Sequence, residues 1–114
     1  MGMTAEVFGI GPYKESLVQC YEYDERYYRG TVEGAIITVR LFGIYEGSTV
    51  SREFASFLGI NDAWDFNQHK IDPSKVDKEG LIDFGNRYTD YDENCEYFLK
   101  LLDAGYEFHF LPNG

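Results

Sequence analysis

Residues 35–45 read AIITVRLFGIY and carry the clearest strand signal in the chain. Thr38 and Arg40 are polar, whereas the odd-numbered positions, apart from Gly43, are apolar: Ala35, Ile37, Val39, Leu41 and Tyr45. Alternation with a period of two is typical of a β-strand with one face in the core and the other partly in water. The stretch therefore predicts a middle strand whose odd-numbered side chains are buried.

Shorter patterns near the two ends of the chain predict two further strands. Residues 4–10 form the first strand, and the turn residues Gly11 and Pro12 follow it. Pro12 is well placed to open a helix, because its fixed φ suits the first helical position. Alternating aromatic and polar residues predict the last strand over 106–111, in the order Tyr106, Glu107, Phe108, His109 and Phe110.

Apolar residues at helical spacing predict helices between these strands. The first helix follows Pro12, and its apolar face consists of Tyr13, Leu17, Cys20 and Tyr21. The second follows Gly47, Ser48 and Thr49, which supply a turn and an N-cap, and it ends at Gly59. Its apolar face consists of Val50, Phe54, Phe57 and Leu58.

A third helix has the clearest boundaries. Asp90 is the expected N-cap, Glu93 three residues later completes a capping-box pattern, and Gly105 ends the helix. Its apolar stripe consists of Tyr91, Cys95, Phe98 and Leu102. Residues 61–86 show weak periodicity, so we expect them to be mostly irregular, with room for one short helix or extended piece.

The order of these elements predicts a single compact α+β domain over residues 1–114. Three strands form a small sheet, and about three helices cover it, which gives a two-layer sandwich. Cys20 and Cys95 each fall on an apolar helix face. We therefore expect both to be buried, reduced thiols of the core.

Charge and aromatic content point to the kind of partner. The chain has 20 acidic and 10 basic residues, a net charge of −10, ten tyrosines and nine phenylalanines. Such a field repels nucleic acid, whose binding depends on clustered Lys and Arg, and it attracts basic proteins. No apolar run approaches the roughly 18 to 20 residues that span a bilayer, and the N-terminus lacks the pattern of a secretory signal. We expect a cytoplasmic protein that binds neither membrane nor nucleic acid.

Two stretches combine phenols with carboxylates and are the candidate partner-binding residues. Such a mixture binds Lys and Arg through ion pairs, hydrogen bonds and cation-π contacts. The alternative for each stretch is a solvated helix edge. The residues assigned to partner binding are Tyr23, Asp24, Glu25, Tyr27, Tyr28, Tyr88, Asp90, Asp92 and Glu93.

A second hypothesis places general acid-base chemistry in the irregular segment. Asp62, Asp65, His69 and Asp72 cluster around Trp64, and a nearby carboxylate could orient His69. No local motif marks a nucleophile, and acidic irregular segments are usually solvated loops. A surface loop anchored by Trp64 is the alternative to catalysis.

Residues 77–84 resemble the middle of an EF-hand calcium loop, with Gly80 at the turn. Lys75 stands where that loop requires its first Asp, and Asn86 stands where the bidentate Glu should be. A cation at the first ligand position opposes calcium, so an acidic turn is the favoured interpretation.

Three other motifs are incomplete. Gly9 and Gly11 suggest a phosphate loop, but the third glycine is missing, which favours a plain strand-to-helix turn. Residues 49–60 resemble the first helix of a helix-turn-helix, but residues 61–68 lack a basic face, so we expect a core helix. The residues available for zinc are scattered singly, without the close pairing of structural sites: Cys20, Cys95, His69 and His109. We assign no metal and no cofactor.

The leading functional hypothesis is a small acidic binding module, an inhibitor or immunity-type protein that blocks a basic nuclease or nucleic-acid-binding partner. In size and charge the chain is similar to the small acidic inhibitors with which bacteria neutralise nuclease toxins, and to phage inhibitors of nucleic-acid-binding proteins; this is an analogy only. The alternatives are a small enzyme that uses the segment between Asp62 and Asp72, and a homo-oligomer, such as a homodimer, that buries an aromatic sheet face.

Overall fold

An antiparallel sheet of four strands lies at the centre of the computed structural model, which describes residues 4–18, 31–61 and 67–113. The three predicted strands are confirmed, and a fourth, very short strand adds to the expected sheet. The strands pair in the order β2-β1-β4-β3. They are β1 (Thr4–Pro12), β2 (Ile36–Ile44), β3 (His69–Lys70) and β4 (Glu107–Asn113).

Strand β1 runs through the two residues that were expected to end it. Pro12 is its last residue, and helix α1 (Glu15–Val18) begins three residues later, so the prediction that Pro12 opens a helix is wrong. Gly9 and Gly11 lie inside the strand and not in a strand-to-helix turn. A Cβ at Gly11 would lie 2.6 Å from the Tyr106 ring. The glycines therefore make room for two aromatic side chains, Phe108 of β4 for Gly9 and Tyr106, which directly precedes β4, for Gly11.

A β-bulge changes the phase of β2 in its middle. Val7 of β1 pairs with Phe42, whereas Phe8 pairs with Arg40, so Leu41 is the extra residue. Leu41 and Phe42 are both buried, and beyond them the even-numbered side chains face the core. The expectation that Tyr45 is buried is therefore wrong, since 61% of its surface is exposed.

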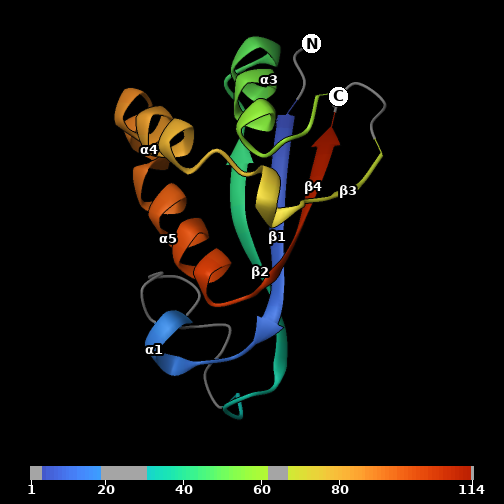
Figure 1. Cartoon of the computed structure of the whole chain (residues 1–114), viewed down its shortest axis with the longest axis vertical. Coiled ribbons are helices and arrows are strands. Elements are labelled where there is room, and N and C mark those ends of the chain that lie inside the picture. The colour runs from blue at the N-terminus through green and yellow to red at the C-terminus, as the bar shows by residue number, and fades with distance from the viewer. Residues whose placement is uncertain (1–3, 19–30, 62–66, 114) are drawn as a thin grey trace.

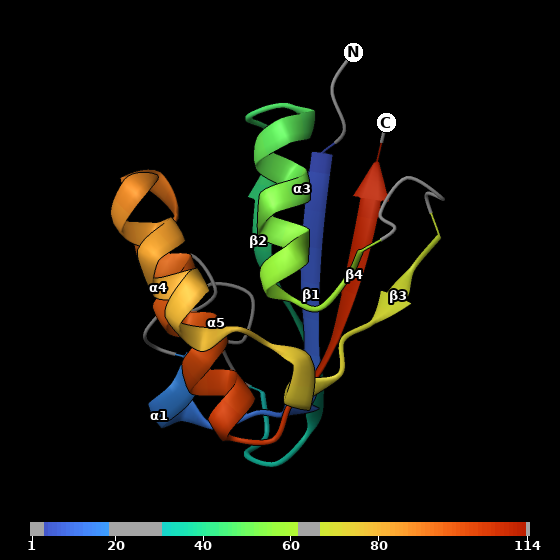
Figure 2. The ribbon, with the colours of Figure 1, turned by 45° about the horizontal axis from the view of Figure 1, so that its top comes forward.

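Three longer helices lie on one face of the sheet (Figures 1 and 2). They are α3 (Ser48–Phe57), α4 (Lys78–Arg87) and α5 (Asp92–Asp103). With α1, the described residues contain four α-helices, one more than expected. The α+β class is confirmed.

Helix α3 is the predicted core helix. Phe54 and Ala55 are buried, and Gly59, with φ of 77°, follows the helix end as expected. Gly47, one of the three residues expected to supply the turn and the N-cap, occupies the N-cap position, and no side chain caps the helix.

The segment expected to be mostly irregular contains more structure than one short piece. It holds β3, the 3₁₀-helix η2 (Pro73–Lys75) and the ten-residue helix α4. Asp77 is the N-cap of α4, where its carboxylate accepts the backbone N–H of Gly80 at 2.9 Å. The stretch that resembles a calcium loop is thus a helix start, not an acidic turn.

Helix α5 starts later than its sequence suggests. The 3₁₀-helix η3 (Thr89–Tyr91) precedes it, Tyr91 is at the N-cap position, and no side chain caps the helix. The predicted capping box of Asp90 and Glu93 is therefore wrong. Gly105, with φ of 87°, follows the helix as expected. Cys95 is buried, as predicted, whereas Cys20 lies outside the described residues.

Phenylalanines are the largest fully buried side chains of the core between the sheet and the helices. Ring contacts link the elements, such as Phe42 with Phe54 at 4.7 Å and Phe98 with Phe108 at 4.6 Å between ring centroids. Many of the chain's aromatic residues therefore lie in the interior and not on the surface. The fully buried phenylalanines are Phe42, Phe54, Phe84, Phe98, Phe108 and Phe110.

Candidate functional site

An acidic helical surface is formed where η3 leads into α5. It consists of Asp90, Asp92, Glu93 and Glu96, all of which are exposed. Asp92 and Glu93 lie in the first turn of α5, where carboxylates interact favourably with the helix dipole. The backbone beneath them is fixed by the buried face of the helix, which includes Phe98. The acids are therefore presented from a rigid element.

The basic side chains of α4 are engaged with other acids. Lys78 lies 3.3 Å from Asp103, and Arg87 donates to Asp83 at 2.9 Å and also to Glu53. These two cations are therefore paired with acids outside the acidic helical surface.

Tyr88 is only partly available to a partner. Its ring is half-buried and packs on Phe84, with 4.8 Å between centroids, and the Arg87 guanidinium lies 5.6 Å from the Tyr88 centroid. Asp83 and Glu53 hold that guanidinium in place. An aromatic ring flanked by carboxylates thus accepts the chain's own arginine in this position.

Tyr91 is also built into the fold. Its hydroxyl donates to Glu46 at 3.2 Å, and burial raises the pKa of its phenol. Of the predicted partner-binding residues, the structure thus brings together Tyr88, Asp90, Asp92 and Glu93 at one corner of the helical layer. The other predicted residues lie outside the described residues: Tyr23, Asp24, Glu25, Tyr27 and Tyr28.

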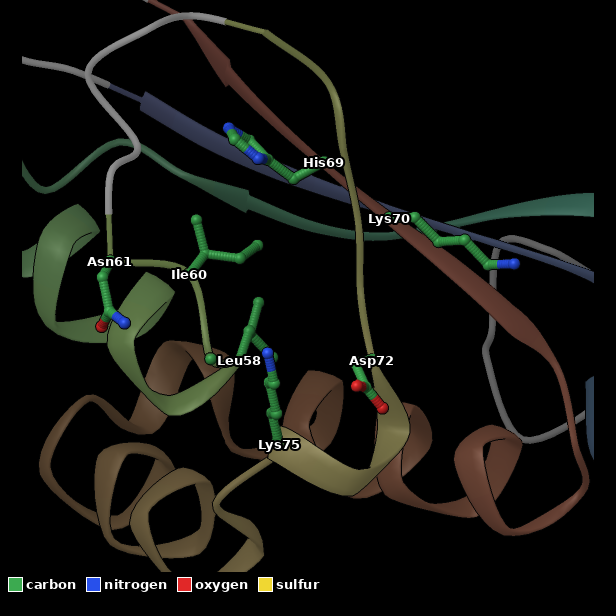
Figure 3. Close-up of a pocket in the computed structure, with 8 residues that line it drawn as sticks. Leu58, Ile60, Asn61, His69, Lys70, Asp72 and Lys75 are labelled. Carbon is green, nitrogen blue, oxygen red and sulfur yellow. The ribbon is translucent and has the colours of Figure 1, made fainter.

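A pocket of about 300 Å³ lies between the end of α3, β3 and η2 (Figure 3). Two residues of the proposed acid-base cluster, His69 and Asp72, line it. The others, Asp62 and Asp65, and the neighbouring Trp64 lie outside the described residues. The full lining is Leu58, Gly59, Ile60, Asn61, His69, Lys70, Asp72 and Lys75.

The carboxylate of Asp72 is used to cap η2. It accepts the Ser74 backbone N–H at 3.0 Å and the Ser74 hydroxyl at 2.8 Å, and these bonds lower its pKa. Figure 3 shows the His69 ring and the Asp72 carboxylate at different ends of the pocket. The Asp72 carboxylate is thus held at η2 by Ser74 and does not lie beside the His69 ring.

A polar cluster between β3 and β4 was not found from the sequence. His109 lies 2.7 Å from Glu107 and 3.0 Å from Gln68, and Lys70 lies 3.2 Å from Glu107. Hydrogen bonds from His109 and Lys70 lower the pKa of Glu107. The alternation of polar Glu107 and His109 with aromatic residues was visible in the sequence. Their partners, Lys70 of β3 and Gln68 just before it, were not, because no sequence pattern predicts β3.

The two histidines do not share a site. Phe110 is the register partner of His69, and His109 is that of Lys70, so the histidines lie on opposite faces of the sheet. Among residues 4–18, 31–61 and 67–113, no group of three or more His, Cys, Asp or Glu residues could hold a metal ion.

The chain matches no protein-family model, no curated protein and no solved structure. No helix in the described part of the chain combines the length and the apolar character that a membrane crossing requires.

Proposed function

We propose that the chain is a cytoplasmic protein-binding module that blocks a basic partner, such as a nuclease or another nucleic-acid-binding protein. The observation that carries the proposal is the acidic helical surface on η3 and α5. A site that binds nucleic acid already has positive potential, so an acidic surface gains both association rate and specificity toward it. The proposal assigns no catalytic step to the chain.

The neighbourhood of Tyr88 supports arginine as a contact on the partner. Arg87 already lies against the Tyr88 ring and is held by Asp83 and Glu53. Guanidinium groups bind carboxylates in fixed geometry and stack on aromatic rings, whereas lysine acts as a point charge. A partner's arginine placed beside Tyr88 and Asp90 would meet the same combination of groups.

The test is inhibition of a basic nuclease or nucleic-acid-binding protein, sought first among the products of the genes beside this chain's gene. The wild-type chain and an Asp92→Asn/Glu93→Gln variant are titrated against that protein's nucleic-acid cleavage or binding. The control is Glu15→Gln/Glu33→Gln, which removes the same charge from two exposed residues: Glu15, the first residue of α1, and Glu33, whose side chain accepts the Glu15 backbone N–H and can still do so as Gln. Circular dichroism verifies that all three chains are folded.

We expect the wild type and the control to inhibit at similar concentrations, and the Asp92/Glu93 variant to need about tenfold more protein. The control and the variant lose the same charge, but only the variant loses it at the interface. Equal inhibition by all three chains would place the interface elsewhere. Absence of inhibition by the wild type would overturn the proposal for that partner.

A further inference from the structure

The sheet has a second face that no described helix covers. Helices α3 and α5 contact the sheet from one side, and both ribbon views show the other side free of them (Figures 1 and 2). Side chains of β1 alternate between buried and partly exposed along its length, as expected for a strand with one uncovered face. Phe8 and Ile10 are the large apolar residues of β1 on this open sheet face.

Two ion-paired groups lie on the same face as these apolar residues. On the β2 side, Arg40 lies 3.4 Å from Glu6, and its guanidinium donates to Tyr45 at 2.9 Å. On the β3 side, Lys70 lies 3.2 Å from Glu107. The register places Arg40 beside Phe8 on one side and His109 beside Phe8 on the other. The open sheet face thus combines apolar side chains with ion-paired groups, a mixture that protein interfaces also show.

Charge on the open sheet face is balanced, in contrast to the rest of the chain. Glu6 and Glu107 are each paired with a basic residue of the same face, whereas the chain as a whole has a net charge of −10. The unbalanced acids therefore lie elsewhere, including the acidic helical surface. This face could be buried without leaving its carboxylates as unpaired charges.

We propose that a second copy of this chain covers the open sheet face, so that two sheets pack against each other in a homodimer. A two-fold interface sets a patch against itself, so a patch with net charge repels its own copy, and a balanced one does not. Packing through the sheets also places the acidic helical layers on the two outer sides of the dimer. Their mutual repulsion is then small, because the distance between them exceeds the Debye length of about 8 Å at physiological salt.

The test is the molar mass in solution, measured by light scattering over a wide range of protein concentration. We expect the mass to rise from the chain mass of 13.2 kDa toward twice that value, and to rise at lower protein concentration when salt is added. Salt acts in this direction because, at 0.01 M, the Debye length of about 30 Å leaves two acidic chains repelling each other, and added salt shortens that length. This response is opposite to that of binding to a basic partner.

Ile36→Glu tests the face itself, because Ile36 pairs with Pro12 on this side of the sheet and is 70% exposed. Ile82→Glu is the matched control, since Ile82 is 53% exposed on α4. We expect Ile36→Glu to remain at the chain mass at concentrations where the wild type and Ile82→Glu are dimers. A wild type that stays monomeric at high concentration and high salt would overturn the proposal, as would an equal response of the two variants.

Discussion

At the scale of single residues, the absence of a side chain at Gly11 lets the Tyr106 ring pack directly against β1. The Tyr106 ring fills the space in which a Cβ would lie, and the Tyr106 hydroxyl donates to the Pro12 carbonyl. We predict that Gly11→Ala lowers the free energy of unfolding by about 1 to 3 kcal/mol, because the added methyl group overpacks the core. Urea denaturation measures this loss.

The control is the same substitution in a Tyr106→Leu background, where the ring is gone. The loss should then be smaller, and the difference between the two losses gives the coupling between the positions. An equal loss in both backgrounds would show that the ring contact is not the cause.

Cys95 is a second residue whose environment sets its chemistry. Burial raises the pKa of its thiol to about 12, and the nearby Asp92 carboxylate acts in the same direction. Since the thiolate is the reactive form, we predict that Cys95 is labelled slowly in the native protein and quickly in denaturant. The measurement uses a Cys20→Ser variant, so that a single thiol is followed. Rapid labelling without denaturant would contradict the buried position.

At the scale of secondary-structure elements, two aspartates differ in their effect on helix starts. Asp77 accepts a backbone N–H of α4, whereas Asp90 caps no helix. We predict that Asp77→Ala lowers the free energy of unfolding by about 1 kcal/mol and that Asp90→Ala changes it little. Thermal and urea denaturation of the two variants test this difference. A larger loss of stability from Asp90→Ala than from Asp77→Ala would contradict this assignment and would favour the capping box expected from the sequence.

The link between β3 and β4 should depend on pH through Glu107. Hydrogen bonds from His109 and Lys70 hold the pKa of Glu107 below its ordinary value of 4.5, so the carboxylate stabilises the fold above that value. The stabilisation is lost as the pH falls through the lowered, folded-state pKa. We predict that Glu107→Gln is less stable than the wild type near neutral pH, and that the difference shrinks in acid. A difference that is constant with pH would contradict this role.

Strands and long amphipathic helices were predictable from the sequence because a buried face imposes a regular apolar period. The bulge at Leu41 was not, since both sides of the strand are apolar there and only the register with β1 fixes the change of face. Helix α4 was missed because Gly80, Gly85 and Asn86 weaken its helical signal. Its stability comes from packing, which buries Leu81 and Phe84 against neighbouring elements.

The candidate site was predictable only in part. Four of the predicted residues, Tyr88, Asp90, Asp92 and Glu93, lie within six positions of the sequence, so their proximity needed no tertiary information. The anchoring of Tyr88 on Phe84 and of Tyr91 on Glu46 depends on contacts between elements, and the sequence does not show it. Truncation of Tyr88 would therefore affect packing as well as partner contact, and Tyr88→Phe is the variant that preserves the ring.

At the scale of the whole molecule, charge and apolar surface lie on different sides. The acidic helical surface is on the helical layer, and the open sheet face, with its paired charges, is on the opposite side of the sheet. A homodimer formed through the sheets would leave the acidic helical surface of each copy free for a basic partner. The two proposals are therefore compatible, and salt affects them in opposite directions.

The association rate constant with the basic partner, measured by stopped flow at two salt concentrations, tests the central claim most directly. The Debye length falls from about 30 Å at 0.01 M to about 10 Å at 0.1 M, so we expect association of the wild type to slow strongly over this range. Neutralising all four acids, with Asn at 90 and 92 and Gln at 93 and 96, should slow association at low salt and flatten its salt dependence. Unchanged association of this variant, or a wild-type rate that does not depend on salt, would contradict the claim that Asp90, Asp92, Glu93 and Glu96 attract the partner.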